Sequence, residues 1–265
     1  MSTNLPWEEG EVPPRLSEAA IRLPLYEAAP GVILFRFPTV GRFLVRRGLP
    51  TRVEVFPSAS PAAAEAFLAG PLSAAVSLLD GRFSLRASAV DVGGSAVLVI
   101  GSSSSVNSQM AAIMTTVGYP LLADGIVTFE PGRGWALGRG GRVVLHRRTA
   151  ELMGLDSSAG EPVRPGLASQ VYHLPASSGP LPVRHIFSLS PFLRGAETAI
   201  TPLSGTRKVT VLTQSCWHGE LVEPLGLAAA MFRWSTDLAS AAPVSLVGWG
   251  ADDPRALATR LAGHT

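Results

Sequence analysis

The segment from Ser95 to Glu130 constrains the fold of this chain more than any other stretch, because it predicts a strand, a loop, a helix and a second strand in succession. Its first part, Ala96 to Ile100, is a continuous apolar run that is typical of a strand covered on both faces. Gly101 ends that strand, and four serines fill positions 102–105. Apolar residues then recur at helical spacing from Ser108 to Val117. This order is the outline of a phosphate-binding loop.

The loop keeps only part of the phosphate-binding motif G-x-x-x-x-G-K-[ST]. Gly101 and Ser108 have the motif's spacing, but Val106 stands at the second glycine and Asn107 at the lysine. That lysine normally places positive charge on the transferred phosphates, and the only lysine of this chain is Lys208. Two readings stay open: a phosphate loop served by an arginine, or a serine-rich turn with a structural role.

Two charged residues are expected near this loop. The apolar segment after the helix leads to Asp124, whose carboxylate would lie beside the loop at the end of a strand. In the strand that begins at Gly81, apolar and polar residues alternate, which places Arg86 on the polar face. Arg86 could bind a phosphate or carboxylate through two parallel hydrogen bonds. The alternative is an ion pair with Asp80 or Asp91.

Three runs of this sequence share their order and spacing with one family. They are GRFSLRASAV at Gly81–Val90, SAVLVIGSSSSVNS at Ser95–Ser108 and YPLLADGIVTFE at Tyr119–Glu130. Together they resemble the catalytic core of HPr kinase/phosphorylase and its small single-domain relatives, some of which phosphorylate peptides in natural-product gene clusters. Those relatives typically read hydrophobic-His-Ala-Ser-Ala, then G-x-S-G-x-G-K-S, then L-x-A-D-D. The resemblance spans Arg52 to Leu155.

The resemblance implies an α/β (α+β) fold, with a P-loop-type core, a mixed twisted sheet, flanking helices and a small β-rich N-terminal layer. The chain departs from the family at functional positions. The replacements are Arg86 for the histidine, Ser104 and Val106 for glycines, Asn107 for the lysine, and Gly125 for the second aspartate, which acts as base toward the serine hydroxyl. Gly101, Ser108 and Asp124 are retained. The likeness therefore concerns the fold more than kinase activity.

Composition limits the classes of function. Hydrophobic residues make up 46% of the 265 residues and charged residues 16%, which is typical of a chain with a substantial core. The 22 basic residues nearly balance 20 acidic ones, so we expect no general binding of nucleic acid. The N-terminal sequence has no apolar signal-peptide region, and no apolar run is long enough for a membrane span. We therefore expect a cytoplasmic protein without membrane attachment.

The chain is expected to fold in two parts. Residues 1–58 would form an N-terminal arm and a small β layer, with strands at 31–37, 42–45 and 52–56, and residues 59–265 would form the kinase-like core with a divergent C-terminal part. The pattern predicts helices at 61–79, 149–155, 224–238 and 254–261, and strands at 169–174, 183–189, 208–212 and 244–247. The resemblance adds a helix at 192–201.

The segment after Glu130 predicts a hairpin and a basic patch. Residues 135–137 and 143–146 would pair across a glycine-rich turn. The patch consists of five arginines: Arg133, Arg139, Arg142, Arg147 and Arg148. It could receive an acidic peptide or a phosphate, and the alternative is a solvated face.

The histidines and the single cysteine are further candidates for chemical roles. His173 and His185 are twelve residues apart with no cysteine nearby, so we expect neutral, hydrogen-bonded side chains and no metal site. Cys216 and His218 would share one face of an extended segment, which could let a thiolate and an imidazole cooperate. The alternative for Cys216 is a small buried apolar residue.

Three functional hypotheses follow. The first is a degenerate HPr kinase-like protein that acts on a peptide or protein in the maturation of a peptide natural product, by ATP-independent chemistry such as epimerisation or cyclisation. The second is an active peptide serine kinase, and the third a non-catalytic, peptide-binding pseudokinase. ATP and Mg would be bound only if the loop is functional. A homo-oligomer is a further expectation, because family members form rings.

The candidate residues fall into two groups. The candidate catalytic residues are Asp124, Arg86, Cys216 and His218. The candidate cofactor-binding residues are Gly101, Ser102, Ser103, Ser104, Ser105, Asn107 and Ser108.

Overall fold

The computed structural model describes residues 6–59, 67, 71–101, 103–163, 168–190, 197–250 and 253–264. The chain divides into two compact units. Unit 1 combines residues 1–84 with 217–234, and unit 2 combines residues 85–216 with 235–265. Both contain strands and helices, which confirms the mixed α/β class. The domain boundary expected near residue 58 stays a prediction.

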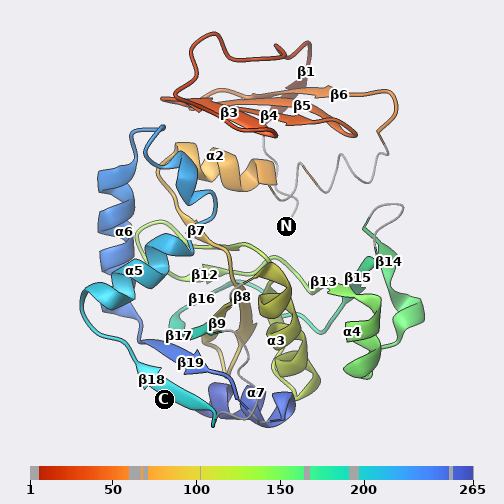
Figure 1. The fold of residues 1–265 in the computed structure, drawn as a ribbon, viewed down its shortest axis with the longest axis vertical. Helices are drawn as coiled ribbons and strands as arrows, with labels where there is room; N and C mark the ends of the chain where they lie inside the picture. The colour runs from red at the N-terminus through yellow and green to blue at the C-terminus, as the bar shows by residue number, and fades with distance from the viewer. Residues whose placement is uncertain are drawn as a thin grey trace. The chain divides into compact units, whose positions relative to one another are not determined.

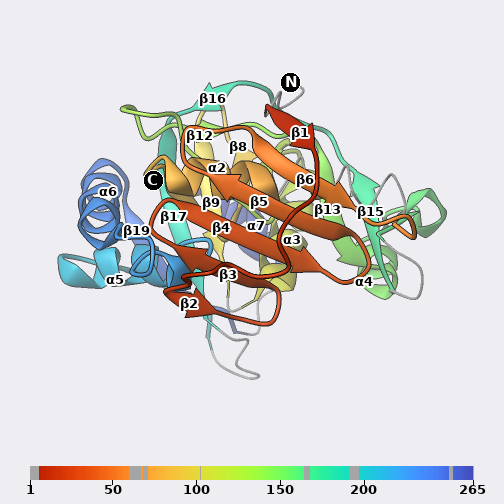
Figure 2. The ribbon, with the colours of Figure 1, turned by 90° about the horizontal axis from the view of Figure 1, so that it is seen from above.

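Unit 1 is built on a six-stranded sheet, shown from above in Figure 2. Its strands are β1 (Trp7–Glu9), β2 (Ile21–Arg22), β3 (Tyr26–Ala29), β4 (Val32–Phe37), β5 (Gly41–Arg46) and β6 (Thr51–Val55). The order is β1-β6-β5-β4-β3-β2, with antiparallel neighbours except for the parallel pair β1 and β6. The three strands predicted for the first sixty residues are therefore confirmed.

The core of unit 1 is aromatic. Phe35 and Phe43, on neighbouring strands, are almost completely buried. The ring of Phe67 lies 5.0 Å from that of Phe43 and 4.0 Å from that of Phe37, measured between centroids. Helix α2 (Ser73–Leu79) is the described part of the helix predicted over 61–79. Most of the remainder of that prediction lies outside the described residues.

Unit 2 contains a second six-stranded sheet, of mixed direction. Its strands are β8 (Ser88–Asp91), β9 (Ala96–Ile100), β10 (Leu121–Ala123), β17 (Val183–Leu189), β18 (Ala199–Pro202) and β19 (Val244–Gly248), in the order β10-β8-β9-β17-β19-β18. Strand β17 runs parallel to β9 and β19, and the other neighbours are antiparallel. Every residue of β9 is buried, as its unbroken apolar run predicts.

Two helices complete the main core of unit 2. Helix α3 (Ser104–Thr116) and helix α7 (Pro254–Gly263) lie beside each other (Figure 1). Their apolar residues pack with those of the sheet. Met110 and Met114 of α3 are fully buried there, beside Leu257 and Leu261 of α7. This packing fixes the N-terminal end of α3 at the end of β9, where the phosphate loop is expected.

Two small sheets replace the hairpin predicted for residues 135–146. Strand β12 (Ala136–Leu137) pairs with β16 (Pro180–Leu181), and β13 (Arg142–His146) pairs with β15 (Ser169–His173), which also pairs with β14 (Glu161–Pro162). The hairpin prediction is wrong because the glycines carry the chain to a different partner. At Gly141 a Cβ atom would lie 2.0 Å from the carbonyl oxygen of Leu174, so glycine permits the close approach that starts the pairing of β13 with β15.

The strand predicted over 208–212 is also wrong, because these residues lie in helix α5 (Thr206–Gln214). Its β-branched residues favour a strand in isolation. In the helix, however, the hydroxyls of Thr210 and Thr213 donate to the carbonyl oxygens four residues earlier, at 3.0 Å each. The chain enters this helix from Gly205, whose φ of 54° suits glycine.

The helix predicted over 192–201 is wrong at its end, where Ala199–Pro202 forms β18 beside β19. Residues 191–196 lie outside the described residues. The remaining elements are β7 (Ser84–Leu85), β11 (Val127–Thr128), α4 (Arg147–Leu152), α6 (Ala228–Ala241), and the 3-10 turns at 157–159 and 219–221. Across the described residues, no helix is long and apolar enough to cross a membrane.

Candidate functional site

The expected phosphate loop lies in unit 2, between the end of β9 and the start of α3. Ser103 precedes the helix in an extended conformation, and the helix begins at Ser104, four residues earlier than the apolar pattern predicts. The hydroxyl oxygens of Ser103 and Ser105 are 2.9 Å apart and exposed. Ser102 lies outside the described residues, as does the side chain of Ser104.

Asn107, at the position of the missing lysine, is turned into the protein. Only 1% of its surface is exposed. Its Oδ1 accepts a hydrogen bond from the backbone N–H of Gly101, and its Nδ2 donates to the carbonyl oxygen of Arg86 at 3.2 Å. A Cβ atom at Gly101 would lie 2.7 Å from this Oδ1, which explains the glycine. The side chain therefore connects the loop to the backbone of Arg86. It also occupies the N–H of Gly101, which is then no longer available as a donor to a phosphate oxygen.

Asp124 follows β10 and lies beside the loop, as the sequence predicts. Its carboxylate accepts hydrogen bonds from the hydroxyl of Ser108, at 2.8 and 2.9 Å, and from the hydroxyl of Ser88 at 2.5 Å. The N–H of Val144 donates to it at 3.3 Å. Burial raises the pKa of the Asp124 carboxyl, and the hydrogen bonds from the two serines oppose this only in part. The site thus holds a carboxyl whose proton affinity is increased, with its oxygens largely occupied by donors.

Arg86 is exposed and bound to backbone. Its Nη2 donates to the carbonyl oxygen of Gln214 at 3.1 Å, and its N–H donates to that of Ser215 at 2.8 Å. Neither expected ion pair forms: Asp80 pairs with Arg82 at 2.8 Å, and Asp91 accepts from Ser177 and Gly94. Within the described residues, Arg86 is therefore a cation beside the loop without a carboxylate partner.

The single lysine does not replace the one missing from the loop. Lys208 lies in α5, and its ammonium group donates to the carbonyl oxygen of Ala239 in α6. That bond joins α5 to α6 and occupies the ammonium group of the lysine. The positive charge of an ordinary phosphate loop is consequently missing from the described part of the loop.

Cys216 and His218 do not share the face of an extended segment, so that expectation is wrong. The chain turns after α5: Cys216 is buried in unit 2 and forms a single antiparallel bridge with Leu85. His218 belongs to unit 1 and adopts a left-handed conformation, with φ of 49°. Its Nδ1 lies 2.6 Å from Glu220 Oε1. Since the hydrogen bond with His218 and a second one from Tyr26 stabilise the Glu220 carboxylate, its pKa falls to about 2 despite partial burial.

The expectation of a neutral histidine is confirmed for His185. Its Nε2 lies 3.0 Å from the hydroxyl oxygen of Ser245, and burial lowers its pKa to about 4. His173 is exposed and lies 3.8 Å from Glu161. Among the residues that the structure describes, no three His, Cys, Asp or Glu side chains are grouped as metal ligands.

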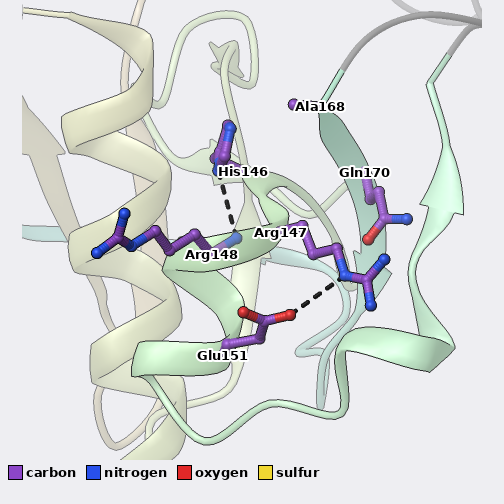
Figure 3. Close-up of a pocket in the computed structure, with 6 residues that line it drawn as sticks. All are labelled: His146, Arg147, Arg148, Glu151, Ala168 and Gln170. Carbon is purple, nitrogen blue, oxygen red and sulfur yellow. Dashed lines mark hydrogen bonds and ion pairs between the residues drawn. The ribbon is translucent and has the colours of Figure 1, made fainter.

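Sequence reasoning missed two groups of residues. Ser88 and Val144 donate to Asp124. The signal for Ser88 lies in strand pairing: Ala123 of β10 pairs with Ala89 of the antiparallel strand β8, so Asp124 comes to lie beside Ser88. The second group lines a cavity of about 540 Å³ in unit 2 (Figure 3). Its lining residues are His146, Arg147, Arg148, Glu151, Ala168 and Gln170. Only the two arginines were part of the predicted basic patch.

Comparison with known proteins finds matches among solved structures. No protein-family model matches this sequence, and no curated protein matches it either. Among solved structures, the HPr(Ser) kinase/phosphatase from Coxiella burnetii matches, with 11% sequence identity and a TM-score of 0.31. The match covers 67% of this chain and 92% of the other. This solved structure comes from the family that the three sequence motifs resemble.

Proposed function

We propose that this chain is a nucleotide-independent, non-catalytic counterpart of the peptide kinases that it resembles, and that it binds a peptide or protein segment. The observation that carries the proposal is the side chain of Asn107. It stands where the motif has lysine, is buried, and forms both of its hydrogen bonds within the protein. The choice of a peptide as the bound molecule comes from the resemblance of the three motifs to peptide kinases.

Charge supports the first part of this proposal. Phosphoryl transfer depends almost wholly on positioning and charge neutralisation. Here asparagine replaces the lysine, and Lys208 donates to a carbonyl oxygen in α6. Arg86 already donates to the carbonyl oxygens of Gln214 and Ser215, at the C-terminal end of α5. Asp124, which would hold Mg, accepts hydrogen bonds from Ser88 and Ser108 instead. These contacts favour a loop that is stable without a nucleotide.

Calorimetric titration of Mg-ATP and Mg-ADP into the full chain tests nucleotide independence. We expect no binding heat at millimolar nucleotide. Asp124→Asn is the matched control, because heat that persists unchanged in this variant does not arise at the Asp124 site. Micromolar binding that disappears in Asp124→Asn would overturn the proposal and return the chain to the kinase hypothesis.

A second candidate is a repurposed enzyme in which Asp124 transfers a proton during ATP-independent peptide chemistry, such as epimerisation or cyclisation. The raised pKa of Asp124 favours it, because a carboxyl with increased proton affinity is a better general base than an ordinary one. Against it, Ser88, Ser108 and Val144 occupy the carboxylate oxygens.

The two candidates differ in what Asp124→Asn does to a peptide that binds. For the enzyme, the variant should bind the peptide but lose exchange of its α-hydrogens in D2O, followed by mass spectrometry. Ser88→Ala should shift the pH profile of that exchange upward, because it removes a hydrogen bond that lowers the pKa of Asp124. If the wild-type chain produces no exchange and no change in mass, the enzyme candidate is wrong and the binding protein remains.

A further inference from the structure

The cavity shown in Figure 3 carries an excess of positive charge. Arg147 and Arg148 line it, and the Nε of Arg147 lies 3.1 Å from Glu151 Oε1. In Figure 3 the guanidinium of Arg148 extends away from Glu151. No carboxylate within the described residues forms an ion pair with it. One arginine is thus balanced by Glu151, and the other leaves a net positive charge at the cavity.

The positive charge continues along β13. Residues alternate along this strand between exposed and buried, so Arg142, Val144 and His146 share its exposed face. Arg142 also lacks an ion pair among the described residues, and His146 leads into the cavity. Between them, Val144 donates its N–H to Asp124. The exposed face of β13 therefore leads from Arg142 to the cavity at His146, while the backbone of the same strand contacts Asp124.

We propose that this cavity and the exposed face of β13 bind an acidic peptide segment through its side-chain carboxylates. The proposal rests on the proposed function, because it names the class of peptide that the chain would bind. Arginine is the side chain best suited to carboxylates, which it can bind with two parallel hydrogen bonds. The class of ligand follows from charge complementarity with Arg142, Arg148 and the partly neutralised Arg147.

The geometry favours an extended segment over a small anion. In Figure 3 the guanidinium of Arg147 points toward Gln170, whereas that of Arg148 points elsewhere, so a single phosphate would not be held by both. Four residue steps separate Arg142 from His146, which corresponds to about 13 Å along a strand. That length fits several acidic residues of an extended peptide.

Fluorescence anisotropy at low ionic strength tests the proposal with the full chain and fluorescein-labelled hexa-aspartate. Labelled hexa-asparagine, which has the same shape without the charge, is the control peptide. We expect saturable binding of hexa-aspartate and none of hexa-asparagine at the same concentrations. Equal behaviour of the two peptides would overturn the proposal. This result does not depend on nucleotide. The proposed function, in contrast, would be overturned by Mg-ATP binding at Asp124, so the two failures are distinguishable.

Variants locate the binding. Arg148→Gln should weaken hexa-aspartate about threefold to fivefold, the range of an exposed ion pair, and Arg142→Gln should act similarly. Arg207→Gln is the matched control, because Arg207 is an exposed arginine of α5 that has no ion pair among the described residues. An equal effect of Arg148→Gln and Arg207→Gln would place the binding elsewhere. Displacement of the peptide by millimolar inorganic phosphate with the same dependence on Arg148 would show a small-anion site and also overturn the proposal.

Discussion

Gly101 is held to glycine by the closeness of the residues that follow it. A Cβ atom here would lie 2.7 Å from Asn107 Oδ1 and 2.8 Å from Val106 Cγ1. We expect Gly101→Ala to lower the free energy of unfolding by about 1–3 kcal/mol, as overpacking does elsewhere. Urea denaturation measures this. Gly263→Ala, at the end of α7 with nothing within 4 Å, is the control and should change stability little. Equal stability of both variants would contradict the close packing at Gly101.

Asn107 stabilises the loop through two hydrogen bonds to backbone. In Asn107→Ala the N–H of Gly101 and the carbonyl of Arg86 would lose their partner. An unsatisfied buried polar group costs about 1–3 kcal/mol, so we expect at least that loss in the free energy of unfolding. Ser105→Ala, an exposed change in the first turn of α3, should cost far less. A loss as small as that of Ser105→Ala would mean that Asn107 does not hold the loop.

At the level of single residues, the sequence predicts positions better than partners. The spacing of Gly101 and Ser108 and the order of the strands correctly predict Asp124 beside the loop. The role of Asn107 could not be predicted, because its hydrogen bonds depend on how the Arg86 backbone is placed against the loop. Likewise the pairing of Cys216 with His218 assumed an extended backbone, and the left-handed His218 breaks that geometry.

Among the elements, helix α7 has the clearest local signal. Asp253 caps it: its Oδ2 accepts from the N–H groups of Arg255 at 3.0 Å and Ala256 at 3.1 Å, and Pro254 follows at the first helical position. We expect Asp253→Ala to lower the free energy of unfolding by about 1 kcal/mol. Asp237→Ala, an exposed position inside α6, is the control for charge removal and should have a smaller effect. Urea unfolding followed by circular dichroism measures both variants. Equal losses of unfolding free energy in Asp253→Ala and Asp237→Ala would show that the cap contributes nothing.

Elements are predictable where one local signal dominates. The unbroken apolar run was sufficient for β9, and the helical spacing of apolar residues over 254–261 was sufficient for α7. Helix α5 was not predictable, because its β-branched residues favour a strand, whereas its non-local contacts, such as the hydrogen bond from Lys208 to Ala239 of α6, are not visible in a local pattern. The pairing of β13 with β15 joins residues between 23 positions (His146 and Ser169) and 31 positions (Arg142 and His173) apart, which no local pattern contains.

At the scale of the whole molecule, carboxylates in the two units should respond to acid in opposite directions. In unit 1, burial alone would raise the pKa of Glu27, but the N–H of Leu16 and the guanidinium groups of Arg36 and Arg22 lower it overall. Its stabilising effect is therefore present above its usual pKa of 4.5 and is lost as the pH falls through the lowered value. In unit 2 the pKa of Asp124 is raised, so stability is lost as the pH rises through it.

Hydrogen exchange of the full chain between pH 7 and pH 3, corrected for intrinsic rates and read peptide by peptide, tests this difference. At pH 7, Glu27→Gln should reduce protection of β3 and β4, and the difference from the wild type should shrink toward pH 3, because the wild-type carboxylate becomes protonated. Asp124→Asn should show the opposite trend in β8 and β10: relative to this variant, the wild type should gain protection as the pH falls and its own carboxyl takes up a proton. Leu16 reports independently on Glu27, because its N–H donates to the Glu27 carboxylate at 2.9 Å and should exchange faster in Glu27→Gln. Parallel trends for the two variants would show that the pKa of Asp124 is not raised. The main support for proton transfer by Asp124 would then be lost.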